Sequence, residues 1–154
     1  MLTIIGCGNP TRSDDGLGSV VARRLRQHVD ALGRADVRVL DAGTDGMAVM
    51  FAARGSEQLV IVDAARTGVE PGAIYEVPGD VLAREYAPSL NLHDFRWDHA
   101  LATGKRVFGP AFPATISVLL VEVERTSFGL ELSAPVEAAA DALVARLQAI
   151  VAAY

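Results

Sequence analysis

The chain has 154 residues, of which 51% are hydrophobic, a formal net charge of −5 and one cysteine, Cys7. This length suits a single domain, residues 1–154, with one hydrophobic core, and the acidic balance without a Lys/Arg-rich run argues against nucleic acid as a partner. No apolar run approaches the roughly 18–20 residues that cross a bilayer, and the N-terminus lacks a signal-peptide pattern. A lone cysteine excludes an intrachain disulfide framework. Together these features lead us to expect a cytoplasmic protein.

The hydrophobic pattern alternates between short apolar runs, typical of strands, and longer amphipathic segments, typical of helices. The first run, Leu2–Cys7, is followed by a helical repeat over residues 16–30. The run at 59–62 is continuous and β-branched, as in a strand that is covered on both faces. The other expected strands are 37–40, 73–77 (a candidate edge strand) and 115–123, and the other expected helices are 47–53, 94–103 and 135–152, with a loop over 79–92 that contains a weak helical stretch.

Strands that alternate with helices predict an α/β fold, in which a parallel or mostly parallel sheet carries helices on both faces. In such sheets the ligand site lies outside the carboxyl ends of the strands. Three of these ends carry distinctive residues, and their convergence is more informative than any one of them. They are Asn9, Asp14 and Asp15 after the first strand, Asp41, Gly43 and Thr44 after the second, and Asp63 after the third.

Each of these acidic residues also has a structural explanation. Asp14 or Asp15 could cap the following helix, but two adjacent aspartates cannot both occupy one N-cap position, which leaves one of them free. Asp63 closes an apolar strand, where an unpaired carboxylate is costly to bury. Its structural explanation is that it caps the next turn. Cys7, between two glycines, is expected to be a small buried residue rather than a nucleophile, and a lone histidine such as His93 is more often structural than a ligand.

The stretch GCGNPTRSDDGLG, residues 6–18, begins like a phosphate-binding loop but does not fit a dinucleotide. The dinucleotide fingerprint needs a third glycine where Thr11 stands, and an acidic residue about 20 residues further on. Asp41 follows Gly8 by 33 residues, which is too far. Asp14 and Asp15 would also repel a pyrophosphate at the helix N-terminus. The charge of this loop therefore favours a cation or an electrophile.

Five stretches of the chain, taken in order, resemble the hydrogenase maturation proteases, the endopeptidases that trim the C-terminus of nickel-iron hydrogenase large subunits. They are GCGNPTRSDDGLG, LDAGTDGM, LVIVDAARTGVEPGAIYEV, SLNLHDF and FGLELSAPVEAA. The most specific block is Gly-x-Gly-Asn followed by two acidic residues before a helix. The resemblance implies a single-domain, three-layer α/β/α fold with a mostly parallel, twisted sheet of about five strands. It also implies a monomeric, aspartyl-type endopeptidase that processes a nickel-iron hydrogenase large-subunit precursor.

The resemblance also implies which residues carry the function. In the family, an acidic residue before the first helix, an aspartate at the end of the third strand and a histidine beyond the fourth strand contact the metal. These positions match Asp15, Asp63 and His93, which are plausible ligands for a divalent first-row metal. The resemblance further implies that this metal is nickel, delivered by the precursor rather than permanently bound. The resemblance assigns contacts with the peptide to Gly43, Thr44 and Gly46 in the turn that borders the cleft, and orientation of the metal-contacting side chains to Asn9 and Asp14.

The chemistry expected from this set is attack by water on the scissile peptide, because the sequence shows no Ser-His-Asp or Cys-His pattern for a covalent acyl-enzyme. Asp15 or Asp63 is the candidate base, and the nickel could instead polarise the carbonyl. Two alternatives stay open. One is a non-catalytic metal- or nucleotide-binding module of similar topology, and the other is a metal-dependent amidohydrolase or peptidase that holds its own zinc, for which His99 is the spare histidine.

The segment Phe95–Val107 lies next to His93 and is a candidate docking surface. On a helix, Phe95 and Trp97 are two residues apart and cannot share one face, so at least one is expected to face the cleft or the solvent. An exposed Trp97 beside Arg96 would suit a protein interface, and Trp97 is therefore assigned to substrate binding. The alternative is an ordinary amphipathic helix with both rings buried.

Overall fold

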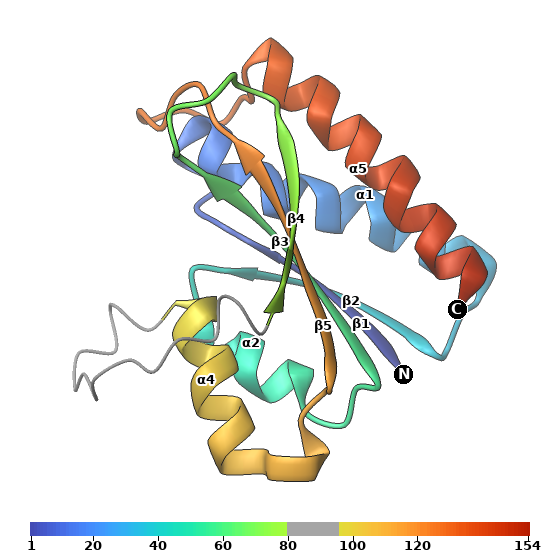
Figure 1. Ribbon diagram of the computed structural model, residues 1–154. Helices are drawn as coiled ribbons and strands as arrows, with labels where there is room; N and C mark the ends of the chain where they lie inside the picture. The colour runs from blue at the N-terminus through green and yellow to red at the C-terminus, as the bar shows by residue number, and fades with distance from the viewer. Residues whose placement is uncertain (80–95) are drawn as a thin grey trace.

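A computed structural model describes residues 1–79 and 96–154 of the chain, which form one sheet with helices on both faces (Figure 1). The strands are β1 (Leu2–Cys7), β2 (Val37–Gly43), β3 (Gln58–Ala65), β4 (Ile74–Pro78) and β5 (Thr115–Glu122). The helices are α1 (Leu17–Leu32), α2 (Gly46–Ala53), α4 (Trp97–Phe108) and α5 (Ala134–Ala153), with short 3₁₀ turns η1 (Ser13–Gly16) and η3 (Gly109–Ala111).

The order of the strands in the sheet places the carboxyl ends of β1 and β3 next to each other. The order is β2-β1-β3-β5-β4, and all pairs are parallel except β4, which runs antiparallel to β5 at one edge. From β1 the chain crosses first to β2 on one side and then to β3 on the other. The crevice between the ends of β1 and β3 is therefore the topological switch point, where open α/β sheets bind their ligands.

Two hydrophobic clusters fill the space between the sheet and its helices, α1 and α5 on one face and α2 and α4 on the other (Figure 1). Alternate residues of β3 serve opposite faces: Val60 and Val62 belong to the first cluster, and Leu59 and Ile61 to the second. This two-sided burial is why the strand is continuously apolar. The predicted three-layer α/β/α fold with a mostly parallel sheet is confirmed, including the edge position of the fourth strand.

Some predicted boundaries were wrong. β3 continues to Ala65, so Asp63 lies inside the strand, opposite Leu120 of β5, rather than at its end. The N-cap of α1 is Gly16, and no side chain caps it, so neither Asp14 nor Asp15 is an N-cap of this helix. α4 extends to Phe108, five residues beyond the predicted end. In the parts of the chain that the structure describes, no helix is long and apolar enough to cross a membrane.

Glu122, the last residue of β5, is a buried carboxylate that fixes the loop after β3. It is 1% exposed and accepts hydrogen bonds from the backbone N–H groups of Thr67 and Gly68, both at 2.8 Å, and from the Thr67 hydroxyl at 2.9 Å. Burial alone would raise the pKa of Glu122, but the hydrogen bonds from Gly68 and Thr67 outweigh it and hold the pKa below its ordinary value. The ionised form therefore stabilises this end of the sheet.

Replacing Glu122 by glutamine is expected to change how stability depends on pH. Because the pKa of Glu122 is lower in the folded chain, its contribution is fully present above the unfolded pKa of about 4.3 and is lost as the pH falls through the folded value. Glu122→Gln keeps the size of the side chain but cannot ionise, so it should be less stable than the wild type at pH 7, with a difference that shrinks below about pH 4. Urea unfolding of both proteins at pH 7 and below about pH 4 measures the difference in stability. A difference that does not change with pH would contradict this prediction.

Candidate active site

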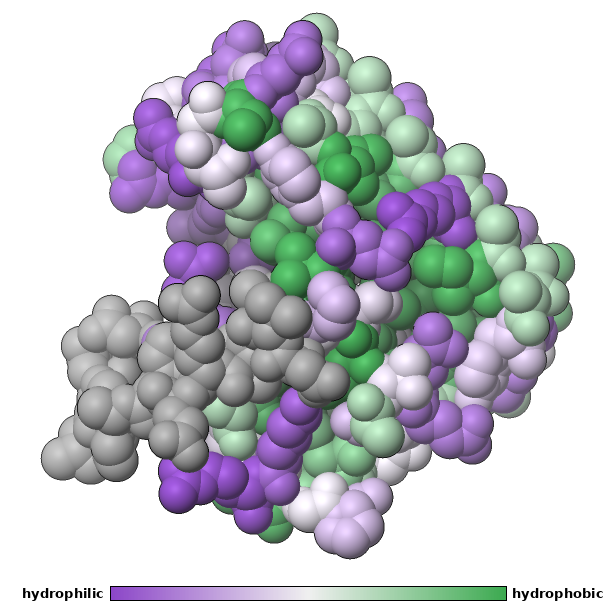
Figure 2. Space-filling view, in the orientation of Figure 1, coloured by the Kyte–Doolittle hydropathy of each residue, from purple (hydrophilic) through white to green (hydrophobic). Residues whose placement is uncertain are grey.

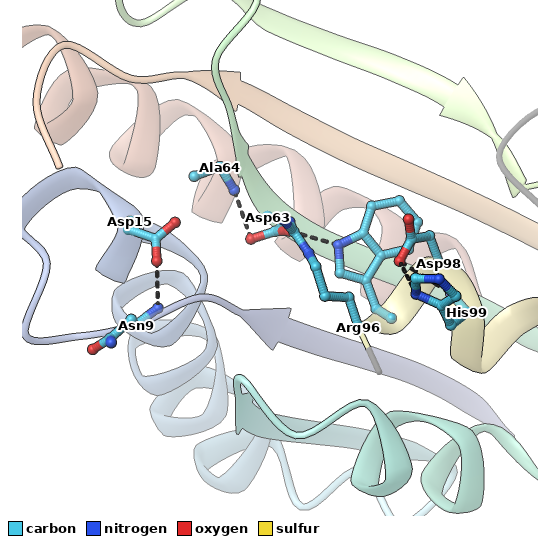
Figure 3. Close-up of polar contacts among 8 residues, drawn as sticks. Asn9, Asp15, Asp63, Ala64, Arg96, Asp98 and His99 are labelled. Atoms are coloured by element: carbon cyan, nitrogen blue, oxygen red, sulfur yellow. Dashed lines mark hydrogen bonds and ion pairs between the residues drawn. The ribbon is translucent and has the colours of Figure 1, made fainter. Parts of the chain in front are cut away.

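The loop after β1 turns sharply and brings Asp15 back over the end of the strand. Gly8 makes this possible: its φ is +124°, and a Cβ there would lie 1.9 Å from the carbonyl oxygen of Asp15, so only glycine fits. The backbone N–H of Asn9 donates to Asp15 Oδ2 at 2.9 Å (Figure 3). The side-chain oxygen of Asn9 accepts from the N–H and hydroxyl of Thr11. Asn9 thus orients Asp15 through its backbone, and its side chain stabilises the turn.

Asp14 has a different role from its neighbour. It is fully buried, and its carboxylate accepts from the backbone N–H groups of Glu124 and Arg125 at 2.9 Å, from the N–H of Ser133 at 2.6 Å and from the Ser133 hydroxyl at 2.9 Å. Burial opposes ionisation, but the bonds from Ser133, Arg125 and Glu124 outweigh it and lower the pKa of Asp14. Asp14 therefore fastens the loop 124–133 to the first loop, and these contacts lead away from Asp15.

Asp63 is the buried carboxylate of the site. It is 3% exposed and accepts from the N–H of Ala64 at 2.8 Å, from the indole N–H of Trp97, and from the guanidinium of Arg96 at 3.3 Å (Figure 3). Burial raises the pKa of Asp63, the hydrogen bonds from Trp97 and Ala64 and the charge of Arg96 partly offset this, and the charge of Asp15 adds to the rise. Asp63 is thus a carboxylate held in an environment that favours proton uptake or a nearby cation.

One cavity of about 220 Å³ brings most of the predicted site residues together. It lies at the carboxyl edge of the sheet, and Figure 2 shows the molecular surface hollowed on the left, with hydrophilic residues at the base of the hollow. Asp15 and Asp63, from segments far apart in the chain, both line the cavity (Figure 3). The rest of its lining is Cys7, Gly8, Gly43, Thr44, Asp45, Gly46, Val49, Arg96 and Trp97. His93, the third expected metal contact, lies outside the described residues.

The turn Gly43–Gly46 borders the cavity and is fixed from both sides. Its Gly43 carbonyl accepts from the N–H of Gly8 at 2.8 Å, which ties it to the first loop. Asp41, which the sequence placed at the end of the second strand, accepts from the Ser19 hydroxyl and from Gly43 N–H, so its carboxylate fixes the turn. Asp45 caps α2 by accepting from Ala48 N–H. The Gly43–Gly46 turn is therefore a rigid wall of the cavity.

Cys7 also lines the cavity, but its thiol is poorly suited to nucleophilic attack. It is 4% exposed and forms no disulfide. Burial raises the pKa of the Cys7 thiol well above its ordinary value, and the charge of Asp63 adds to the rise, whereas a reactive cysteine needs a stabilised thiolate. The prediction of a small buried cysteine is confirmed.

Trp97 does not form the exposed anchor that the sequence suggested. It is 8% exposed, in the first turn of α4, with its indole N–H bonded to Asp63, because a buried indole N–H needs an acceptor. Phe95, its expected counterpart, lies outside the described residues. The sequence pointed to Arg96 only as part of a docking surface and missed that this residue, which precedes α4, pairs with Asp63 across 33 positions of the chain. Its only sequence signal is an arginine next to a tryptophan before a helix.

Replacing Trp97 by phenylalanine is expected to destabilise the fold by about 1–3 kcal/mol, because the buried Asp63 carboxylate loses a charge-assisted hydrogen bond while the ring volume is largely kept. Urea unfolding at neutral pH measures the change. Phe112→Leu, at another buried aromatic position on the same face of the sheet, controls for aromatic packing without a polar contact. A Trp97→Phe variant as stable as the wild type would show that the indole N–H contributes nothing to the site.

The described side chains alone do not make a closed metal site. Within residues 1–79 and 96–154, no group of three or more His, Cys, Asp or Glu residues is arranged to hold a metal ion. The spare histidine, His99, lies on α4, with its ring nitrogen 3.3 Å from Asp98 (Figure 3). Three carboxylates line this cavity. Asp45 caps α2, and Asp15 and Asp63 remain as the anionic contacts for a cation brought from outside.

Comparison with known proteins gives consistent matches. Residues 20–150 match the family model HycI, hydrogenase maturation protease, a range that includes Asp63 and begins just after Asp15. The hydrogenase expression/formation protein HupD of Rhodobacter capsulatus is 30% identical over 123 residues, which are 79% of this chain and 58% of HupD. HoxM of Azotobacter vinelandii is 28% identical over 139 residues, 89% of this chain and 65% of HoxM. The chain thus spans between about half and two thirds of the length of these curated relatives.

Solved structures of hydrogenase maturation proteases share the fold of this chain. The maturating endopeptidase HybD from E. coli superposes with a TM-score of 0.78 at 21% identity, over 97% of this chain and 91% of HybD. The [NiFe] hydrogenase maturation protease HycI from Thermococcus kodakarensis gives a TM-score of 0.75 at 24% identity, over 95% of this chain and 88% of HycI. At these identities the likeness establishes the arrangement of sheet and helices.

Proposed function

The chain belongs to the hydrogenase maturation protease family. We propose that it removes the C-terminal extension of a nickel-iron hydrogenase large-subunit precursor after nickel insertion. The observation that carries the proposal is the pair Asp15 and Asp63, which two separate segments bring to one cavity at the switch point of the sheet. The names of the relatives, hydrogenase expression/formation proteins and maturation proteases, point to the same substrate.

The nickel, in this proposal, is part of the substrate. Asp15 and Asp63 contact the metal that the precursor carries, together with His93 as the family resemblance implies. Two carboxylates leave coordination positions for the precursor's own ligands and for water. Arg96 supplies the positive charge beside Asp63 while no substrate is bound, and it gives way, or reorients, when the metal approaches.

Cleavage proceeds by attack of water on the scissile peptide without an acyl-enzyme. A serine or cysteine route needs an activated nucleophile, and the buried, protonated Cys7 does not offer one. One of the two carboxylates takes a proton from the water as the water oxygen bonds to the scissile carbonyl carbon, and this proton passes to the amide nitrogen as the C–N bond breaks. Asp63 is suited to this step because its raised pKa makes it a stronger base than an ordinary aspartate. Asp63 leaves the metal to act as the base, and Asp15 keeps its contact with the metal and so places the peptide.

The proposal is tested by incubating the purified chain with a nickel-loaded large-subunit precursor and following the intact masses of both proteins. We expect the precursor to lose one C-terminal fragment and the chain to gain no covalent adduct at any time. An uncleaved precursor would contradict the proposed function. Metal analysis of the chain purified without added metal distinguishes the proposed function from the zinc enzyme considered above. One equivalent of tightly bound zinc would favour a zinc amidohydrolase or peptidase.

A further inference from the structure

The loop between β5 and α5 presents two large apolar side chains to the solvent. Phe128 is 82% exposed and Leu130 is 79% exposed, more than any other large hydrophobic residue in the described parts of the chain. They flank Gly129, which forms an isolated parallel β-bridge with Arg12. Such exposure of neighbouring large apolar groups marks an interaction site in a folded protein.

The backbone beneath these side chains is firmly attached to the loop that carries Asp15. Gly129 donates to the carbonyl of Thr11 at 3.0 Å, and its own carbonyl accepts from the N–H of Ser13 at 2.9 Å. The Ser13 hydroxyl donates to the carbonyl of Ser127 at 2.9 Å. Ser13 adopts a left-handed φ of +50°, a conformation that costs a non-glycine residue free energy. The tip of the loop is therefore held in place with its apolar side chains outward.

The stems of the same loop are held by Asp14, whose carboxylate binds the backbone at Glu124, Arg125 and Ser133. Figure 1 shows the loop, between the ends of β5 and α5, beside the one between β1 and α1. One aspartate of the Asp14–Asp15 pair thus anchors the exposed loop while the other lines the cavity. The two adjacent acidic residues link the apolar surface and the site in one rigid unit.

Arg12 completes this surface. Its guanidinium lies 4.6 Å from the centre of the Phe128 ring, a cation–π arrangement, and it belongs to the same loop as Asp15. We call Arg12, Phe128 and Leu130 the 128–130 surface. Aromatic and arginine side chains are the residue types that contribute most binding energy in protein interfaces.

The cavity alone is too small to recognise a protein. Its volume of about 220 Å³ is below the roughly 300–1,000 Å³ of ordinary small-molecule sites, so most of a protein substrate must lie against the surfaces that border the cavity. The 128–130 surface is linked to the cavity through one short loop, residues 8–16, because Arg12 and the cavity residue Asp15 both belong to this loop and Gly129 is bonded to its Thr11 and Ser13. We propose that the 128–130 surface docks the folded body of the large-subunit precursor, through an apolar depression on the precursor with a carboxylate facing Arg12. This inference rests on the proposed function.

The test uses the double variant Phe128→Ser/Leu130→Ser and nickel-loaded precursor, with KM and kcat measured from the intact mass of the precursor. The matched control, Leu32→Ser/Phe51→Ser, likewise removes one exposed leucine and one exposed phenylalanine, on α1 and α2. We expect KM to rise by about tenfold or more in the double variant, with kcat and thermal stability close to those of the wild type and no change in the control.

An unchanged KM in the double variant, with the wild type active, would overturn the docking inference and leave the proposed function standing. A wild type that does not cleave the precursor would overturn both. Sedimentation of the wild type and the double variant distinguishes another occupant: a dimer that the double substitution converts to a monomer would assign this surface to a second copy of the chain. A variant with lowered thermal stability is replaced by Phe128→Ser alone, and the same KM criterion applies.

Discussion

Replacing Asp63 by asparagine is expected to slow cleavage of the nickel-loaded precursor by about 10²-fold or more, because the amide can neither accept the proton of the attacking water nor offer a negative charge to the metal. The fold should survive, since an asparagine oxygen can still accept from the indole N–H of Trp97. Burial raises the pKa of Asp63, so the charged form is a cost at neutral pH, and thermal unfolding of Asp63→Asn should occur at the same temperature as in the wild type or higher.

The matched control for this experiment is Asp141→Asn, which removes one negative charge from an exposed position on α5, where the carboxylate pairs with Arg24. It should cleave the precursor at the wild-type rate. An Asp63→Asn variant that kept half or more of the wild-type rate would remove Asp63 from the chemistry, and the same assay applied to Asp15→Asn would then show whether the other carboxylate carries the reaction alone.

Replacing Asp14 by alanine should lower the free energy of unfolding by about 3 kcal/mol, a large part of the stability of a single domain. The buried carboxylate accepts four hydrogen bonds, and its removal leaves the buried N–H and hydroxyl of Ser133 without their acceptor. Urea unfolding measures the loss. Asp45→Ala, which removes a single cap bond at α2, should lose only about 1 kcal/mol. Equal losses in the two variants would show that the loop 124–133 is held by other contacts.

Much of the fold could be predicted from the sequence, because its determinants are local. The apolar run of β3 and the amphipathic repeat of α1 each identify the element and the faces that it buries. Boundaries depend on contacts that the pattern does not contain. β3 continues through Asp63 because it pairs with the whole of β5, and α1 begins at Leu17 because the preceding residues form a 3₁₀ turn that packs beside β3.

The candidate site divides in the same way. Asp15 and Asp63 could be paired from the sequence because parallel strands end at a common edge. The roles of Asp14 and Trp97 could not, since each is set by a partner far along the chain: Asp14 by Ser133, 119 positions away, and Trp97 by Asp63, 34 positions away. A buried polar group takes whichever partner the fold brings to it, and helical periodicity does not reveal that partner.

In the proposed function, the nickel carried by the precursor completes the site that Asp15 and Asp63 begin. The most direct test compares the cleavage rates of nickel-loaded and nickel-free precursor from one preparation, at equal concentration, by intact mass. We predict that the loaded precursor loses its C-terminal extension while the nickel-free precursor keeps it over the same time. Equal rates for the two would show that the chain recognises the peptide without the metal, and would contradict this role of the nickel.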